Sequence, residues 1–210
     1  MTYAVKELFL TLQGEGVQAG RRAVFLRFAG CNLWSGREDD RATAICTFCD
    51  TDFVGTDGSS GGKYPSAEAL ADIAATVWGD DRTHAYIVIT GGEPLLQLDA
   101  SLIDALHDKG FDIGVETNGT ITAPEGIDWL CVSPKAGSDT VQRIGDELKL
   151  VWPQQGSDWS AMESWAFTHH LVQPMDGLAL RENTLAAVAF VQAHPKWRLT
   201  TQTHKALGLR

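Results

Sequence analysis

The chain has 210 residues, of which 44% are hydrophobic and 21% are charged, as is typical of a globular protein with its own core. Its formal net charge at pH 7 is −10, which argues against a nucleic-acid partner because phosphate backbones repel an acidic surface. No apolar run is long enough to cross a membrane, and the N-terminus lacks the pattern of a secretory signal peptide. We therefore expect a cytoplasmic protein that binds neither nucleic acid nor membranes.

Apolar strand-like runs alternate with helical patterns along the chain. The predicted strands cover residues 23–28, 85–90, 112–116, 129–133, 147–151, 169–173 and 197–201. The predicted helices cover residues 66–78, 100–109, 157–166 and 182–193, and residues 55–62 are expected to form a flexible surface loop. Such alternation is typical of an α/β protein with a mostly parallel sheet. A closed barrel of this kind takes about 250 residues, so we expect an open, partial β/α barrel of roughly six units.

Polar or reactive groups follow the predicted strands at the point where each one ends. These groups are Cys31, Thr90–Glu93, Glu116–Asn118, Ser133–Lys135, Gln173–Asp176 and His204–Lys205. The carboxyl ends of parallel strands lie on one face, and α/β proteins place their active sites there. The sequence therefore predicts an enzyme with its active site at that face.

Three of the four cysteines, Cys31, Cys46 and Cys49, lie close together in the chain. A zinc site usually needs a fourth protein ligand, and no histidine occurs between Cys31 and His84. A redox pair of Cys46 and Cys49 is typical of a thioredoxin-like context that this sequence does not show. Three thiolates can hold a [4Fe–4S] cluster and leave one iron open for another ligand, so we favour an iron–sulfur site.

The remaining cysteine, Cys131, lies within an apolar strand pattern, and we expect it to be a buried structural thiol rather than a fourth ligand. Fourteen residues separate Cys31 from Cys46, and most of this insert is hydrophilic. We expect the insert to bulge outward and to leave the three thiolates converging.

Cys31, Cys46 and Cys49, with Phe48 before the last cysteine, resemble the cluster ligands of the radical S-adenosylmethionine (radical SAM) superfamily, whose usual spacing C-x3-C-x2-C is widened here. Residues 91–94 (GGEP) and 116–119 (ETNG) resemble two further elements of that superfamily. The segment LQGEG at 12–16 and the Asp50-Thr51 pair after the last cysteine narrow the resemblance to the 7-carboxy-7-deazaguanine synthase family. Two alternatives are an activase of glycyl-radical enzymes and, from another class, a zinc-stabilised binding module.

The family resemblance implies a carbon–nitrogen lyase of queuosine and deazapurine biosynthesis. Its reaction is the ring contraction of 6-carboxy-5,6,7,8-tetrahydropterin to 7-carboxy-7-deazaguanine with loss of ammonia, initiated by a 5′-deoxyadenosyl radical. The implied cofactors are a [4Fe–4S] cluster, S-adenosylmethionine (SAM) and Mg²⁺. The implied partners are the pterin, an electron donor such as flavodoxin, and a second copy of the chain in a homodimer.

The resemblance also implies roles for individual residues within a single domain spanning residues 1–210, with a substrate-binding segment at 1–20 and a cluster loop at 30–52. Cys31, Cys46 and Cys49 would hold the cluster, the amino and carboxylate groups of SAM would take the open iron, and Thr51 would bind magnesium. The implied SAM-binding residues are Phe48, Asp50, Gly92, Glu116, Ser133, Lys135, Gln173, Pro174, Met175 and Asp176. The implied substrate-binding residues are Leu12, Gln13, Gly14, Glu15, Arg27, Thr90, His204 and Arg210. A mid-strand guanidinium such as that of Arg27 needs a ligand or an acid, and we favour the substrate carboxylate.

Overall fold

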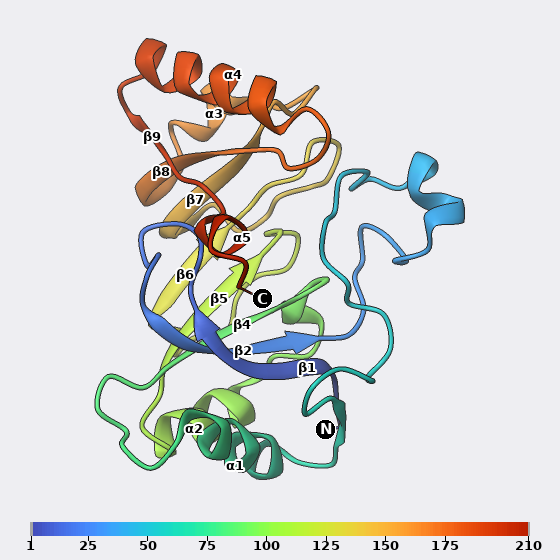
Figure 1. Ribbon diagram of the computed structural model, residues 1–210, viewed down its shortest axis with the longest axis vertical. Coiled ribbons are helices and arrows are strands. Elements are labelled where there is room, and N and C mark those ends of the chain that lie inside the picture. Colours follow the sequence, from blue (N-terminus) through green and yellow to red (C-terminus); the bar gives the residue numbers. More distant parts are fainter. Residues whose placement is uncertain (1, 210) are drawn as a thin grey trace.

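The computed structural model describes residues 2–209, which form a nine-stranded sheet with helices packed along its outside (Figure 1). The strands are β1 (Tyr3–Leu12), β2 (Arg22–Phe28), β3 (Gly62–Tyr64), β4 (Tyr86–Gly91), β5 (Asp112–Thr117), β6 (Trp129–Val132), β7 (Ile144–Trp152), β8 (Ala166–Pro174) and β9 (Trp197–Leu199). The helices are α1 (Ala67–Trp78), α2 (Ala100–Asp108), α3 (Trp159–Met162), α4 (Leu180–Ala193) and α5 (Thr203–Ala206), with 3-10 turns η1 (Glu38–Thr43) and η2 (Pro94–Leu96). None of the helices within residues 2–209 is long and apolar enough to cross a membrane.

The strand order is β3-β1-β2-β4-β5-β6-β7-β8-β9, with β3 and β9 at the two edges. The strands from β2 to β9 along this order run parallel, whereas β1 is antiparallel to both of its neighbours. The predicted open, partial β/α barrel is therefore confirmed. The parallel strands bring their carboxyl ends, and the polar residues that follow them, to one face.

Helices α1 and α2 cover the sheet at the lower part of Figure 1. Each begins at a side chain that accepts a hydrogen bond from a free backbone N–H group, Ser66 from Ala69 at 3.2 Å and Asp99 from Leu102 at 3.0 Å. Their apolar faces join the main core, where Leu102 is fully buried. Burying such a leucine contributes about 2 kcal/mol, and cutting it to alanine would cost about 2–5 kcal/mol.

An aromatic cluster beneath α4 fixes the other end of the sheet. The ring of Phe190 lies 4.5 Å from that of Trp152, 5.1 Å from Trp159 and 5.8 Å from Trp197, measured between centroids. Trp197 on β9 is 1% exposed, so this cluster seals the last parallel strand against α4. The carboxyl ends of β7 and β8 are thereby held beside those of β4 to β6.

Three segments differ from the sequence predictions. Strand β1 was not predicted because the charged Lys6 and Glu7 interrupt its apolar pattern; Lys6 pairs with Asp52 at 2.9 Å, which accounts for its burial. The helix predicted at 157–166 is only the short α3, because Ala166 already pairs with β7 as the first residue of β8. The predicted surface loop at 55–62 ends in the short edge strand β3.

Candidate active site

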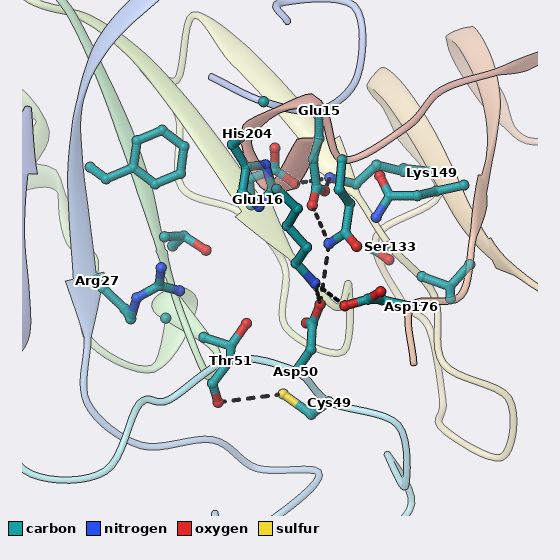
Figure 2. Close-up of a pocket in the computed structure, with 18 of the residues that line it drawn as sticks. Glu15, Arg27, Cys49, Asp50, Thr51, Glu116, Ser133, Lys149, Asp176 and His204 are labelled. Atoms are coloured by element: carbon teal, nitrogen blue, oxygen red, sulfur yellow. Dashed lines mark hydrogen bonds and ion pairs between the residues drawn. The ribbon is translucent and has the colours of Figure 1, made fainter. Parts of the chain in front are cut away.

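The carboxyl ends of the parallel strands open onto a cavity of about 320 Å³ (Figure 2). Three segments cover it: residues 12–15 after β1, residues 46–52 of the cysteine loop, and residues 202–205 near the C-terminus. Nearly all of the site residues expected from the sequence line this cavity: Leu12, Gln13, Gly14, Glu15, Arg27, Cys46, Phe48, Cys49, Asp50, Thr51, Thr90, Gly92, Glu116, Ser133, Lys135, Gln173, Pro174, Met175, Asp176 and His204. Two expected residues are not among the lining residues. Cys31 lies against the lining residue Gly92, and Arg210 lies outside the described residues.

The GGEP and ETNG segments are joined by the carboxylate of Glu93, which is fully buried. Its two oxygens accept hydrogen bonds from the Thr117 hydroxyl at 2.7 Å, the Asn118 backbone N–H at 2.8 Å and the Leu95 backbone N–H at 2.9 Å. Burial raises the pKa of Glu93, and these donors oppose that rise by stabilising the carboxylate. Glu93 thus ties the end of β4 to the end of β5 and fixes one wall of the cavity.

Gly92 lets the cysteine loop approach the end of β4. A Cβ atom at this position would lie 2.3 Å from the Gly30 carbonyl oxygen and 2.5 Å from the Cβ of Cys31. Any side chain would therefore push the first cysteine away from the strand end.

The cysteine thiols differ in their surroundings, and all of them are free. A hydrogen bond from Cys46 lowers the pKa of Cys49 to about 6 although burial opposes it, and the same bond raises the pKa of Cys46. Burial raises the pKa of Cys31, whose Sγ accepts the Leu33 N–H at 3.4 Å. Within residues 2–209 no three Cys, His, Asp or Glu side chains already surround one point as a metal site would. The predicted convergence is therefore seen for Cys46 and Cys49 and is not shown for Cys31.

The insert between Cys31 and Cys46 forms the outward excursion that was predicted (Figure 1, light blue at the right). The turn η1 in this insert has no buried residue. Trp34, near the start of the insert, is only 7% exposed and packs edge-on against Phe53, with 5.6 Å between the ring centroids. Cys131, by contrast, is 2% exposed on β6 and donates to Glu147 at 3.5 Å, as expected of a structural thiol.

Lys149 forms the floor of the cavity together with two carboxylates (Figure 2). Its Nζ lies 2.6 Å from Glu15 Oε2 and 2.6 Å from Glu116 Oε2, and its side chain is 4% exposed. The Gln13 amide donates to Glu116 at 3.0 Å, and the Gln202 amide donates to Glu15 at 2.8 Å. Burial would lower the pKa of Lys149, but the two carboxylates outweigh it and hold that pKa well above its ordinary value. The floor is therefore a permanently charged group that connects β7, β5 and the segment after β1.

Lys205 closes the cavity from the C-terminal segment. Its Nζ lies 2.5 Å from Asp50 Oδ2 and 2.5 Å from Asp176 Oδ2, joining the cysteine loop to the end of β8. Burial would raise the pKa of Asp50, but hydrogen bonds from Lys205 and Gln202 lower it instead. The two ion pairs hold the C-terminal segment across the mouth of the cavity.

Gly14 contacts the C-terminal segment at residues 202–205. The Gly14 carbonyl oxygen accepts from both the backbone N–H and the hydroxyl of Thr203 at 2.8 Å. A Cβ on Gly14 would lie 2.1 Å from Nδ1 of His204, so only glycine leaves room for the histidine that lines the cavity.

Lys135 is a second lysine in the cavity, and it is half-buried. Its Nζ donates to the carbonyl oxygen and the hydroxyl of Ser133, both at 2.7 Å, and lies 5.9 Å from the ring centroid of Phe48. Within residues 2–209 it makes no ion pair with a carboxylate, and burial lowers its pKa. Lys135 is thus an ammonium group available to an anion in the cavity.

Arg27 has a protein acid as a partner, whereas the sequence prediction favoured a ligand alone. Its Nε donates to Glu7 Oε1 at 3.0 Å, and the two side chains are 18% and 12% exposed. Arg27 also lines the cavity, next to Thr90 on the neighbouring strand. The acid was missed because it lies on β1, which was not predicted as a strand.

The cavity contains further residues that the sequence did not assign to the site: Glu7, Phe9, Phe25, Asp52, Gly91, Lys149, Val151, Gln202 and Lys205. Lys149 carried a usable signal, since a lysine within an apolar strand needs a buried partner. Gln202 carried none, because its role depends on where the C-terminal segment folds back.

Comparisons with known proteins agree with this geometry. The sequence model of the Radical SAM superfamily matches residues 41–148, about half of the chain. The 7-carboxy-7-deazaguanine synthase of Bradyrhizobium diazoefficiens is 62% identical over 210 residues, covering 100% of both chains. That of Caulobacter vibrioides is 60% identical over 209 residues, again covering 100% of both. The crystal structure of QueE from Escherichia coli superimposes with a TM-score of 0.70 and 26% identity, covering 97% of this chain and 95% of that one. The chain is therefore a radical SAM protein and belongs to the 7-carboxy-7-deazaguanine synthase family.

Proposed function

We propose that this chain converts 6-carboxy-5,6,7,8-tetrahydropterin to 7-carboxy-7-deazaguanine by a radical ring contraction that releases ammonia. Family membership over the full length of the chain supports this reaction. The observation that carries it furthest is that one cavity joins the cysteine loop, the GGEP and ETNG walls, and polar groups from both ends of the chain.

The donor set fits an iron–sulfur cluster and SAM. Three free thiols come from one loop, no histidine lies between Cys31 and Cys49 in the sequence, and Cys49 already has a lowered pKa. Cys31, Cys46 and Cys49 would hold the cluster. When bound, the cluster and SAM supply the 5′-deoxyadenosyl radical that removes a hydrogen atom from the substrate.

The walls near the cysteine loop would bind SAM. Lys135, held by Ser133 and without a carboxylate partner, would take an anionic group of this ligand. Phe48 and Asp50 would border the adenine, and Glu116 would accept a ribose hydroxyl. Gly92 and the strand end formed by Gln173, Pro174, Met175 and Asp176 would complete the site.

The opposite side of the cavity would bind the pterin. Arg27, whose Nε donates to Glu7, would face the substrate carboxylate. The floor carries two carboxylates against one ammonium, and this excess of acceptors suits the N–H groups of a pterin ring. Leu12, Gln13, Gly14, Glu15, Thr90 and His204 would complete this side, with Arg210 beyond the described residues.

Thr51 would bind magnesium through its hydroxyl, with water and substrate oxygens as the other ligands. The flanking carboxylates of Asp50 and Asp52 are already paired with Lys205 and Lys6, at 2.5 and 2.9 Å. These two carboxylates would therefore not bind the magnesium ion, and its positive charge would be available to the substrate oxygens.

We further propose a single radical SAM domain over residues 1–210, with residues 1–20 binding substrate and residues 30–52 forming the cluster loop. The electron donor would be a small redox protein such as flavodoxin. The working form would be a cytoplasmic homodimer.

Anaerobic turnover tests the proposal. Reconstituted protein is incubated with the carboxy-tetrahydropterin, SAM, Mg²⁺ and a reductant, and the products are identified by mass spectrometry. We expect a brown protein that forms 7-carboxy-7-deazaguanine without any protein partner. A loaded cluster with no such product would overturn the reaction. A requirement for a partner protein would indicate an activase instead, and tightly bound zinc in a colourless protein would indicate a binding module.

A further inference from the structure

The insert that separates Cys31 from Cys46 sends one side chain back to the cysteine loop. Arg41, at the end of η1, donates from Nη1 to the Thr47 carbonyl oxygen at 3.1 Å and to the Cys49 carbonyl oxygen at 3.0 Å. These two carbonyl groups lie on either side of Phe48. Residues 47–53 contain no helix or strand, so Arg41 provides hydrogen bonds that regular structure would otherwise supply.

The guanidinium of Arg41 is itself fixed by two further contacts. Its Nε and Nη2 pair with both carboxylate oxygens of Glu38, at 2.7 and 2.6 Å. Its planar group stacks on the ring of Trp34 at 3.9 Å from the centroid. Trp34 is 7% exposed and also donates from Nε1 to the Arg37 carbonyl oxygen at 3.1 Å. The insert therefore presents a guanidinium in one defined orientation.

A second arginine in the same insert lacks these contacts. Arg37 is 73% exposed on its side chain and lies 3.8 Å from the exposed Asp39, whereas the side chain of Arg41 is 27% exposed. The insert thus contains one arginine directed at the cysteine loop and one directed at solvent.

We propose that Arg41 is a positioning residue for the cluster loop. It holds the backbone on both sides of Phe48, and so sets where the Cys49 thiolate and the Phe48 ring stand when the cluster and SAM are bound. This inference rests on the proposed cluster site. A lysine could not replace Arg41 fully, because bonding two carbonyls while pairing with Glu38 and stacking on Trp34 needs a planar fork.

The experiment compares Arg41→Ala, Arg41→Lys and the matched control Arg37→Ala as full-length, anaerobically reconstituted proteins. Iron and sulfide per chain are measured, followed by the rate of cluster loss to an iron chelator, read from the visible absorbance. We expect Arg41→Ala to lose its cluster about tenfold faster than wild type, Arg41→Lys to lose it at an intermediate rate, and Arg37→Ala to match wild type.

Two further variants separate positioning from general stability. Ile103→Val trims the core far from the cysteine loop and should lower the melting temperature without changing the rate of cluster loss. Glu38→Gln alters only an exposed partner and should accelerate the loss about two- to threefold through Arg41. The electron paramagnetic resonance spectrum of the reduced cluster with SAM should change in Arg41→Ala and not in Arg37→Ala.

Equal rates of cluster loss in Arg41→Ala and wild type would overturn the inference, as would equal effects of Arg41→Ala and Arg37→Ala. A wild-type protein that holds its cluster but forms no deazaguanine would overturn the proposed function and leave the role of Arg41 intact. A wild-type protein that takes up no cluster would overturn both.

Discussion

Lys149 and Lys135 line the same cavity, the first buried and the second half-buried, and their charges have different partners. Lys149 lies between Glu15 and Glu116, and its pKa is held well above the ordinary value. Among residues 2–209, Lys135 has only the hydroxyl and carbonyl oxygens of Ser133 as close acceptors, and burial lowers its pKa. Lys149 therefore positions protein groups, whereas Lys135 is left for a ligand.

The two lysines also mark two sides of the cavity. The charges that act on Lys135 include those of Cys46 and Cys49 in the cysteine loop, together with those of Lys149 and Cys131. Those that act on Lys149 come from Glu116, Glu15, Cys131 and Glu147, on the floor and the strands beneath it. Removing a buried cation that is paired with carboxylates lowers the stability of the fold. A cation without such a partner lowers the stability itself until a ligand binds to it.

The largest effect should come from Lys149→Met. Two carboxylates would then face each other without a cation, so the free energy of unfolding should fall by about 3–5 kcal/mol. Displacement of Gln13 and Glu15 should reduce kcat/KM for the pterin by about a hundredfold. Urea unfolding and anaerobic steady-state kinetics measure the two effects.

The matched control for this variant is Lys63→Met, because Lys63 is exposed on the edge strand β3. It should change neither quantity. Adding Glu116→Gln to Lys149→Met should restore part of the stability, since one of the two opposed charges is removed. A Lys149→Met protein as stable as wild type would contradict the role given to this residue.

Lys135→Met should have its main effect on the ligand. We expect the Kd for SAM to rise by about ten- to a hundredfold, because an anionic group of the ligand would lose its charged partner. The unfolding free energy of the ligand-free protein should stay within about 1 kcal/mol of wild type or rise, since a half-buried ammonium without a carboxylate partner is removed. Anaerobic titration calorimetry and urea unfolding separate these two outcomes.

The free energy of unfolding of wild type and of Lys135→Met should also depend differently on pH. The pKa of Lys135 is lower in the folded chain than its ordinary value of 10.5, so the unfolded chain binds more protons between those two pKa values. Stability from this group should therefore rise with pH across that window. Any stability advantage of Lys135→Met over wild type should shrink as the pH rises toward 10.5, and an advantage that grows would contradict the assignment.

The smallest effect on the cluster should come from Cys131→Ala. Cys131 is 2% exposed on β6 and its thiol bonds to Glu147, whereas the other three cysteines belong to the cysteine loop. Iron content should match wild type, with a stability loss of about 1 kcal/mol from the small cavity. Cys31→Ala should abolish cluster binding, and iron retained in that variant would show that Cys31 is not a ligand.

The sequence alone could predict the fold class and the face of the sheet that carries the site, because both depend on local residue patterns. The parallel sheet and the face carrying the site followed from alternation and from the polar residues after each strand, and most of the lining residues followed from the family resemblance. Strand β1 could not be predicted, because Lys6 and Glu7 are buried only through partners elsewhere in the chain. Gln202 was missed for the same reason, since its role depends on the segments at 13–15 and 202–205 meeting across the cavity, whereas Lys149 within its apolar strand did carry a signal.

The most direct test is the Kd for SAM of the cluster-loaded wild type, Lys135→Met and Lys149→Met proteins, measured anaerobically beside their urea midpoints. We predict that Lys135→Met weakens SAM binding at least about tenfold with an unchanged or higher midpoint, while Lys149→Met lowers the midpoint. A Lys135→Met protein that binds SAM as tightly as wild type would contradict the division between a lysine kept for the ligand and a lysine kept for the fold.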